Sequence, residues 1–296
     1  MTARFLPHAR LQDLIDALAE GGRQVIGPLV REGAVVLAPL REASQFPWGV
    51  WDVQEPGKYT LEEGEKDRAF AWVNGPVSLK PFLFKQQETL WRAETNLDGE
   101  LEYESVVEVA PMAVIGARPC DLAAAQIQDR VFLEGDNVDP RYQARRQSLF
   151  TVVLNCTRSA STCFCVSQGG SPRADHGFDL AMTELHGGLV VESGSEDGAA
   201  LLATLDLDEA TEAQLLAVAA GVQEAADTQR KDLPPPEKLA AILAAAKDHP
   251  QWDVAAERCE SCGNCTKLCP SCLCHKQTYL PSLDGEGGEQ VREGAS

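Results

Sequence analysis

Six of the ten cysteines of this 296-residue chain lie within sixteen residues near its C-terminal end. The run CESCGNCTKLCPSCLC begins at Cys259 and ends at Cys274, and its first four cysteines are spaced C-x2-C-x2-C-x3-C with Pro270 directly after the fourth. This spacing is typical of a tight loop whose thiolates hold an iron–sulfur cube, with the proline turning the fourth cysteine away from the loop. Gly263 and Asn264 fit this prediction, because both tolerate the positive φ angles that such a loop needs.

Zinc and disulfides are the alternatives to an iron–sulfur cube in this run. Zinc sites usually pair two C-x2-C units about a dozen or more residues apart, whereas here three cysteines are followed closely by Cys-Pro. A disulfide framework would need an oxidising compartment. Residues 1–20 carry charge in their middle and lack the apolar core of a signal peptide, so we expect a cytoplasmic protein whose cysteines bind metal. The metal ligands predicted from the run are Cys259, Cys262, Cys265, Cys269, Cys272 and Cys274.

The composition allows two domains and argues against nucleic-acid binding. A hydrophobic fraction of 44% is ordinary for a folded protein of a length that can bury a sizeable core. The 26 basic and 45 acidic side chains give a net charge of −19, so the basic stripe of a phosphate-binding face is not expected. The simplest consequence of this acidity is solubility. No apolar run reaches membrane-spanning length, and we expect no membrane span.

The N-terminal third of the chain predicts a helix followed by paired strands. Apolar residues recur at helical spacing over 9–20, and the apolar runs 24–30 and 34–40 indicate a hairpin or two adjacent strands. The further expectations are a loop over most of 45–66, a strand over 70–74, and a helical tail from about residue 85 within 79–93.

The central part of the chain predicts a parallel βαβ unit. A buried-type strand over 113–118 precedes helical segments and a second buried strand over 149–155. The helical segments are 121–132 and 139–147. Cys120 and Cys156 each follow the carboxyl end of one strand, so we expect both thiols at one sheet edge, where open α/β sheets place their ligands.

A Ser/Gly-rich loop carries two more cysteines toward the same edge. Cys163 and Cys165 follow Cys156 in the stretch TRSASTCFCVSQGG, which brings the number of cysteines expected there to four. Four thiolates are the number that holds a second cube. The alternative is that these are ordinary small core residues, which suits Cys120 better than the two loop cysteines. Arg118 is either a charge that tunes the potential of this second cluster or part of a surface ion pair.

The last third of the chain predicts strands, helices and a domain boundary. We expect strands over 178–185 and 188–192 and helices over 194–205, 209–227 and 238–247. The prolines 234–236 mark the boundary between an α/β domain, 1–232, and a cluster-binding segment, 233–296. From Asp284 the tail is too polar to fold alone.

No catalytic residue is predicted. The chain has no G-x-G-x-x-G fingerprint, no phosphate loop and no G-x-S-x-G motif, and its five histidines show no paired spacing. An enzymatic α/β domain that uses a cysteine is therefore the weaker hypothesis.

These motifs together resemble a known family. KPFLFKQQETLW, GARPCDLAAAQIQDRVFL, VLNCTRSASTCFCVSQGG and GFDLAMTEL stand in order before the cysteine run. From about Lys80 to Val291 the chain resembles the beta subunits of cytoplasmic sulfhydrogenases, which are NiFe hydrogenases, and the A subunit of anaerobic sulfite reductase. These proteins are grouped as four-iron dicluster proteins.

The resemblance implies an electron-transfer subunit that catalyses nothing alone. Such a subunit passes electrons between a flavin- or NAD(P)-binding subunit and hydrogenase or reductase subunits. The expected fold is an α/β (α+β) N-terminal domain with a short helical, ferredoxin-like C-terminal segment, holding one 4Fe-4S cluster there and a second in the α/β domain. The alternative is a structural subunit stabilised by a zinc or iron–sulfur site that never changes its oxidation state.

One departure from the family pattern concerns the fourth ligand of the C-terminal cluster. Family members continue after a segment like Val291-Arg292-Glu293 into a second ferredoxin cysteine set, whereas this sequence stops at Ser296. In two-cluster ferredoxins the Cys-Pro cysteine serves the other cluster. A cluster held by the first three cysteines of the run would then need its fourth ligand from Cys269, Cys272, Cys274 or a partner. Alternatively, the sequence is a truncated product, which is the interpretation that we favour.

Overall fold

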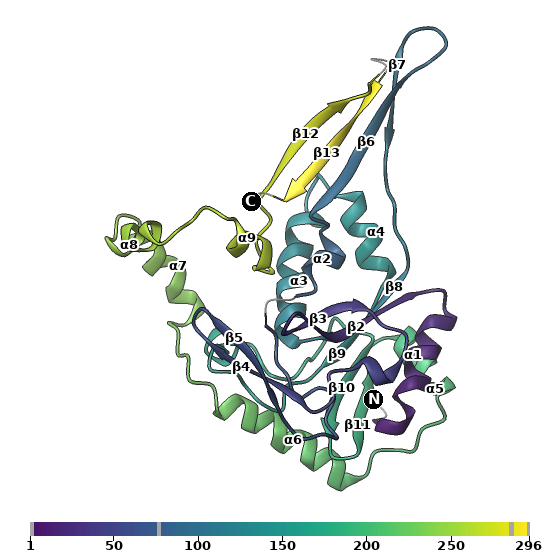
Figure 1. The fold of residues 1–296 in the computed structure, drawn as a ribbon, viewed down its shortest axis with the longest axis vertical. Coiled ribbons are helices and arrows are strands. Elements are labelled where there is room, and N and C mark those ends of the chain that lie inside the picture. The colour runs from purple at the N-terminus through teal and green to yellow at the C-terminus, as the bar shows by residue number, and fades with distance from the viewer. Residues whose placement is uncertain (1–2, 76–77, 284–286, 295–296) are drawn as a thin grey trace. The chain divides into compact units, whose positions relative to one another are not determined.

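The computed structural model describes residues 3–75, 78–283 and 287–294. The chain forms two compact units, each assembled from segments that are distant in sequence (Figure 1). The first unit consists of Met1–Ser78, Pro111–Ala123 and Leu149–Trp252, and the second of Leu79–Ala110, Ala124–Ser148 and Asp253–Ser296. The fold is therefore mixed α/β. The domain boundary expected between residues 232 and 233, which separates the α/β domain from the cluster-binding segment, stays a prediction.

In the described residues of the first unit, seven strands form one sheet in the order β1-β11-β10-β9-β8-β2-β3. The four central strands β2, β8, β9 and β10 run parallel, and the outer pairs are antiparallel. Pairing of Ile115 with Val152 places β8 beside β9 and confirms the predicted βαβ unit. The strands are β1 (Arg4–Pro7), β2 (Gln24–Arg31), β3 (Ala34–Pro39), β8 (Met112–Ala117), β9 (Leu149–Leu154), β10 (Leu180–Leu185) and β11 (Gly188–Ser193).

The core of this unit lies on a face of the sheet against α1 (Leu11–Glu20) and α5 (Glu196–Thr204). All six residues of β9 are buried, as expected of a parallel strand that is covered on both faces. Phe150, Val152 and Leu154 alternate along β9 and join the same core cluster as Leu14 of α1. The helix expected over 9–20 is thus confirmed, because its apolar stripe meets this face.

The remaining elements of the first unit include one hairpin that the sequence did not suggest. β4 (Val50–Glu55) pairs antiparallel with β5 (Lys58–Glu63) through a two-residue turn, so the expectation of a loop over most of 45–66 is wrong. Gly57 at this turn has a φ of +77°, which glycine adopts without strain. The other helical elements are η1 (His8–Arg10), η2 (Ala43–Gln45), the start of α3 (Pro119–Phe132), η3 (Val166–Gln168), α6 (Glu212–Asp227) and α7 (Pro236–Ala245).

The segment expected as a strand over 70–74 has no regular secondary structure. Its main-chain groups are hydrogen-bonded by side chains instead of by a neighbouring strand. Arg118 donates to the carbonyls of Phe70 and Trp72, and Arg158 donates to that of Ala71. The prediction of a strand is therefore wrong, because these side chains take the place of a sheet partner.

In the described part of the second unit, four strands form an antiparallel sheet in the order β12-β13-β6-β7. They are β6 (Gln87–Thr95), β7 (Leu101–Ser105), β12 (His275–Pro281) and β13 (Gly287–Gly294). The expectation of a helical tail from residue 85 is wrong, because β6 occupies this stretch. The polar tail, expected to be unable to fold alone, pairs over 287–294 with β12 and β6 as β13, while 284–286 and 295–296 lie outside the described residues. The helical elements are α2 (Lys80–Leu83), the remainder of α3, α4 (Pro140–Ser148), α8 (Gln251–Glu257) and α9 (Asn264–Leu268).

A buried ionic network ties β13 into this unit. Glu88 on β6 accepts hydrogen bonds from Arg145 of α4 at 2.7 Å and from Arg292 of β13. Arg292 also contacts Asp139 at 2.6 Å, and its side chain is 5% exposed. The strand formed by the polar tail is therefore stabilised by charge pairing rather than by apolar burial alone.

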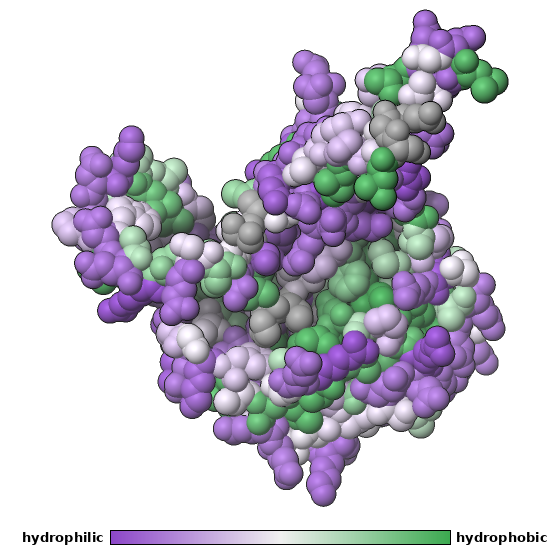
Figure 2. All heavy atoms as spheres, turned by 45° about the horizontal axis from the view of Figure 1, so that its top comes forward, coloured by the Kyte–Doolittle hydropathy of each residue, from purple (hydrophilic) through white to green (hydrophobic). Residues whose placement is uncertain are grey.

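Figure 2 shows one face of the molecule, on which hydrophilic residues alternate with exposed apolar areas. The many hydrophilic residues are in keeping with the net charge of −19. Among the helices that the structure describes, none is both long and apolar enough to cross a membrane.

Candidate metal centres

The first candidate centre begins at the carboxyl ends of β8 and β9. Cys120 is the second residue of α3 and lies three residues after the end of β8, and Cys156 lies two residues after the end of β9. The main-chain N–H of Cys156 donates to the carbonyl of Pro172 at 2.9 Å, which fixes the turn that leaves the strand. Because β8 and β9 are parallel neighbours, both cysteines lie at one sheet edge, as the sequence predicts.

The loop that follows brings two further cysteines to this edge. Cys163 donates its main-chain N–H to Ala160 at 3.1 Å, and Gly170 donates to the carbonyl of Cys165 at 2.9 Å, so the loop folds back on itself. Although part of Cys120 is exposed, the protein packed around its sulfur raises the pKa of the thiol well above its usual value. Asp121 and the sulfurs of Cys156, Cys165 and Cys163 raise it further.

Burial and neighbouring charges act on the thiols of this group. Burial raises the pKa of Cys156, and the neighbouring sulfurs of Cys163 and Cys165 add to this effect while Arg118 opposes it. Burial also raises the pKa of Cys163. Four thiolates gathered in one partly desolvated place repel one another, and a metal centre would offset that repulsion. The chemistry of the set therefore fits an iron–sulfur cluster or zinc.

Polar side chains from distant segments point at three of these sulfurs. Gln229 donates to Cys165 Sγ at 3.0 Å, and Asn74 donates to Cys120 Sγ at 3.5 Å. Arg118 Nη1 lies 3.9 Å from Cys156 Sγ. Such donors stabilise charge on sulfur, so they suit thiolates better than neutral core thiols.

A buried carboxylate orders the beginning of the segment that carries Asn74. Glu184, at the end of β10, accepts hydrogen bonds from the main-chain N–H groups of Ala69 at 2.7 Å and Phe70 at 3.1 Å. Arg68 donates to the same carboxylate at 2.9 Å. The carboxylate therefore substitutes for the strand partner that this segment lacks.

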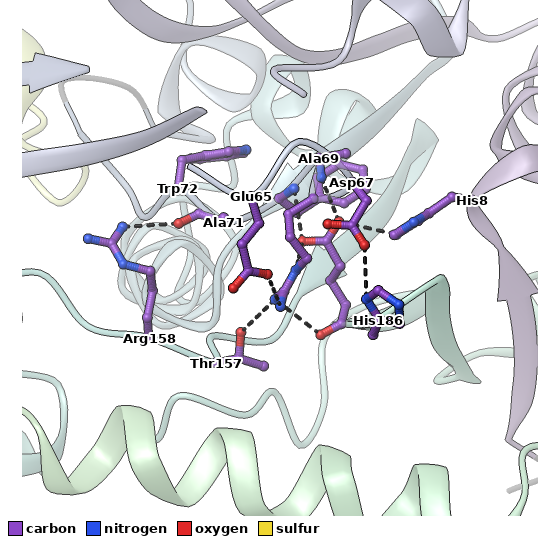
Figure 3. Close-up of polar contacts among 12 residues, drawn as sticks. His8, Glu65, Asp67, Ala69, Ala71, Trp72, Thr157, Arg158 and His186 are labelled. Atoms are coloured by element: carbon purple, nitrogen blue, oxygen red, sulfur yellow. Dashed lines mark hydrogen bonds and ion pairs between the residues drawn. The ribbon is translucent and has the colours of Figure 1, made fainter. Parts of the chain in front are cut away.

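A second buried carboxylate orders the end of this segment. Asp52, which is fully buried on β4, accepts from the main-chain N–H of Val73 at 2.7 Å and from Arg158 at 2.9 Å. Arg158 also donates to the carbonyl of Ala71 at 3.0 Å, as Figure 3 shows. Asn74 is thereby held at a defined position beside Cys120, although 46 residues separate the two in sequence.

The second candidate centre is the C-terminal cysteine run. Gly263 has a φ of +69°, as predicted, but Asn264 is the first residue of α9 and the other positive φ in this loop, +54°, belongs to Ser261. The expectation for Asn264 is thus wrong, because its main chain begins a helix. The contacts of Cys259 and Cys265 are local ones with Ser261 and Thr266.

Cys269 and Cys272 lie together and share a hydrogen bond. Burial would raise the pKa of Cys269, but hydrogen bonds from Ser271 and Cys272 outweigh it and lower the pKa to about 7. The same hydrogen bond raises the pKa of Cys272, and the sulfur of Cys274 adds to that rise. Cys269 is therefore the member of this group that most readily becomes a thiolate, the form that binds metal.

Two buried side chains of the second unit anchor the run. Lys80 of α2 donates to the carbonyls of Thr266 at 2.8 Å and Cys269 at 3.1 Å. Gln128 of α3, which is 1% exposed, donates to the carbonyl of Pro270 at 2.6 Å. These contacts fix the main chain on both sides of Cys269.

Within the described ranges, no three His, Cys, Asp or Glu side chains come close enough together to hold a single metal ion. The ligands of a four-iron cluster bind separate iron atoms, and so they lie farther apart than the ligands of one ion. The cysteine groups are therefore defined by the hydrogen bonds and charges just described, and their role as ligands stays a prediction.

Comparison with known proteins relates the chain to a hydrogenase subunit. Over 199 residues it is 31% identical to the beta subunit of sulfhydrogenase 2 from Pyrococcus furiosus. The chain belongs to the family of this sulfhydrogenase beta subunit. The matched region covers 67% of this chain and 57% of the Pyrococcus subunit, so the chain spans little more than half the length of that relative. Neither a protein-family model nor a solved structure matches the chain.

Membership of the sulfhydrogenase beta-subunit family confirms the resemblance predicted from the sequence. The donors that contact the sulfurs were not predicted, Arg118 excepted. Asn74 and Gln229 lie 46 and 64 residues from the cysteines that they contact, and neither belongs to a local motif. Lys80 stands in the conspicuous LKPF stretch, but its contacts with the cysteine run depend on the tertiary fold.

Replacing Lys80 with methionine is expected to loosen the cysteine run. The substitution removes the Lys80 donor from the carbonyls of Thr266 and Cys269, of which the second keeps the main-chain N–H of Cys272 at 3.3 Å, at a local cost of about 1–3 kcal/mol. Hydrogen exchange of the main-chain amides in 264–272 should accelerate. The matched control is Lys276→Met, because the Lys276 side chain is 66% exposed and pairs with Glu293. Equal exchange rates in the two variants would show that Lys80 does not anchor the run.

Proposed function

We propose that the chain is an iron–sulfur electron-transfer subunit of a cytoplasmic oxidoreductase complex of the hydrogenase, sulfhydrogenase or sulfite-reductase type. It relays electrons between a flavin- or NAD(P)-binding subunit and a catalytic subunit, and catalyses nothing alone. The relationship to a protein named as a subunit of a sulfhydrogenase supports this role. The same role predicts a soluble protein, with its partners among the other subunits of the complex.

The observation that carries the proposal is the convergence of four thiols with polar donors at one sheet edge. A structural core cysteine needs no hydrogen bond to its sulfur, whereas three of these sulfurs have a donor nearby. In the second unit, hydrogen bonds lower the pKa of Cys269 to about 7, so its thiol loses its proton more readily than an ordinary cysteine. Both features favour metal–thiolate chemistry over ordinary packing.

Two ligand sets follow from this arrangement. In the α/β domain, proposed as 1–232, the ligands of a 4Fe-4S cluster are Cys120, Cys156, Cys163 and Cys165. In the ferredoxin-like segment, proposed as 233–296, the ligands come from Cys259, Cys262, Cys265, Cys269, Cys272 and Cys274. A bound four-iron cluster supplies reversible one-electron reduction. The protein's own part is to hold the sulfurs, donate hydrogen bonds to them and limit their contact with water.

Reduction followed by electron paramagnetic resonance tests this function. Dithionite treatment of the anaerobically prepared protein should bleach its colour and produce a paramagnetic signal, because a cluster that carries electrons must accept one. The rival is a structural subunit whose zinc or iron–sulfur site never changes its oxidation state. A protein that stays silent and unchanged in colour under dithionite would favour that rival.

A further inference from the structure

The first candidate centre contains a buried arginine, Arg118, whose main-chain N–H donates to the Asp121 carboxylate at 2.9 Å and whose guanidinium forms no ion pair within the described residues. Arg118 is 2% exposed, and its Nη atoms lie near the carbonyls of Phe70, Trp72 and Asn155 and the sulfur of Cys156. Among the described residues, no carboxylate lies within ion-pair distance of its guanidinium, and its Nε has no hydrogen-bond partner. The guanidinium carries a full positive charge, which thus lies beside the sulfur of Cys156.

The surrounding structure fixes the position of this charge. The guanidinium lies over the indole ring of Trp72, 4.4 Å from the ring centre. Two residues before Arg118, the register of β8 shifts at Gly116, whose φ of +110° suits glycine alone. Such bulges commonly re-aim a side chain near a functional site. After this bulge, Arg118 reaches the carbonyls of Phe70 and Trp72 and the sulfur of Cys156.

The energetics indicate that the charge has a partner in the working protein. Burying a charge without an opposite charge is costly, even when carbonyl oxygens accept its hydrogen bonds. The sulfur of Cys156 lies 3.9 Å from Nη1 of Arg118, whereas the buried Asp121 carboxylate accepts from the main-chain N–H of Arg118 and forms no ion pair with its guanidinium. Four thiolates around iron and sulfide would supply the missing negative charge.

We propose that Arg118 raises the reduction potential of the metal centre formed by Cys120, Cys156, Cys163 and Cys165. This rests on the proposed function, because it requires a cluster at that site. An added electron increases the negative charge of the cluster and its ligands, and a fixed cation nearby stabilises the reduced state more than the oxidised one. Arg118 thus shifts the equilibrium between the oxidised and the reduced cluster. It forms and breaks no covalent bond.

The test measures the potential of this centre alone. In a full-length background with Cys259→Ala, Cys262→Ala and Cys265→Ala, a potentiometric titration followed by electron paramagnetic resonance gives the midpoint potential. Arg118→Met should lower the equilibrium constant for reduction by roughly tenfold or more, which is about 59 mV per tenfold for one electron. Arg118→Lys, which keeps the charge, should lie closer to the parent protein.

The matched control is Arg23→Met. Arg23 also stacks on an aromatic ring, 5.0 Å from the centre of Phe150, but Phe150 lies at the opposite end of β9 from Cys156. Its removal should leave the potential unchanged. A potential in Arg118→Met equal to that of the Arg23 variant would overturn the proposal.

Two further outcomes concern whether the Arg118 variants fold and whether the parent protein binds iron and sulfide at this centre. Arg118→Gln removes the same charge and keeps an amide donor for the carbonyls, so it replaces Arg118→Met if the latter does not fold. If circular dichroism shows that neither neutral variant folds, Arg118 is a structural residue and the proposal is wrong. A parent protein that folds but binds no iron and sulfide at this centre would instead contradict the proposed function.

Discussion

Replacing Glu88 with alanine is expected to lower the free energy of unfolding of the second unit by about 3–5 kcal/mol. The Glu88 carboxylate is 7% exposed and receives both Arg145 and Arg292, so its removal leaves two buried guanidinium groups without this partner. Arg292 retains Asp139, whereas Arg145 retains, among the described residues, the carbonyl of Leu83 as its hydrogen-bond partner. Urea denaturation followed by hydrogen exchange of the β6 and β13 amides measures the loss.

Glu289→Ala is the matched control for this prediction. Glu289 lies on β13 and pairs with Arg92 at 2.9 Å, but both side chains are more than 40% exposed. Exposed pairs contribute about 0.2–1 kcal/mol. Similar losses in the Glu88 and Glu289 variants would show that the buried network does not hold β13 in place.

The network also predicts how stability depends on pH. Burial would raise the pKa of Glu88, but its hydrogen bonds with Arg145 and Arg292 hold it below the ordinary value of 4.5. The contact with Arg292 likewise lowers the pKa of Asp139 below 3.8 against the effect of burial. Both carboxylates therefore stabilise the fold fully above these values, and this contribution is lost as the pH falls through the lower pKa of the folded state. The decrease in the free energy of unfolding as the pH falls should therefore be smaller in Glu88→Ala than in the parent protein.

Replacing Cys163 and Cys165 together with alanine is expected to halve the iron content. The double variant removes half of the proposed ligands of the first centre and leaves the C-terminal run intact. Iron and acid-labile sulfide should fall from about eight to about four of each per chain, since each cube holds four irons. Chemical analysis of anaerobically prepared protein provides the measurement.

The residue between these cysteines supplies the control. Phe164 is 48% exposed, so Phe164→Ala changes the loop without removing a thiol or opening the core. Its iron content should match that of the parent protein. Unchanged iron in the double cysteine variant, or an equal loss in Phe164→Ala, would show that Cys163 and Cys165 are not ligands.

The parts of the fold that the sequence predicts are those with a local physical signature. The apolar stripe of α1 and the continuous apolar runs of β8 and β9 need no distant partner to be recognised. The convergence of Cys120 and Cys156 then follows from the direction of parallel strands. These predictions succeed because periodicity and strand polarity are set within short stretches of chain.

The parts of the fold that the sequence does not predict depend on side chains that are distant in sequence. Asp52 is a charged residue in the middle of β4, and it is tolerated because Val73 and Arg158 donate to it. The strand formed by the polar tail depends on Arg292, whose partner Glu88 is 204 residues away. No local pattern carries such information, so a sequence of this polarity indicates a loop or a solvated tail.

The same distinction applies to the candidate metal centres. The cysteine spacing from Cys259 is readable because the ligands of one cluster are close in sequence. The donors to the sulfurs, Asn74 and Gln229, are brought in by the tertiary fold. The sequence thus predicts which atoms could bind metal, whereas the structure shows what surrounds them.

Joint determination of metal and acid-labile sulfide in the anaerobically prepared chain tests the central claim most directly. We predict about eight irons and about eight sulfides per chain, four for each of two cubes. One equivalent or more of zinc per chain without acid-labile sulfide would contradict it.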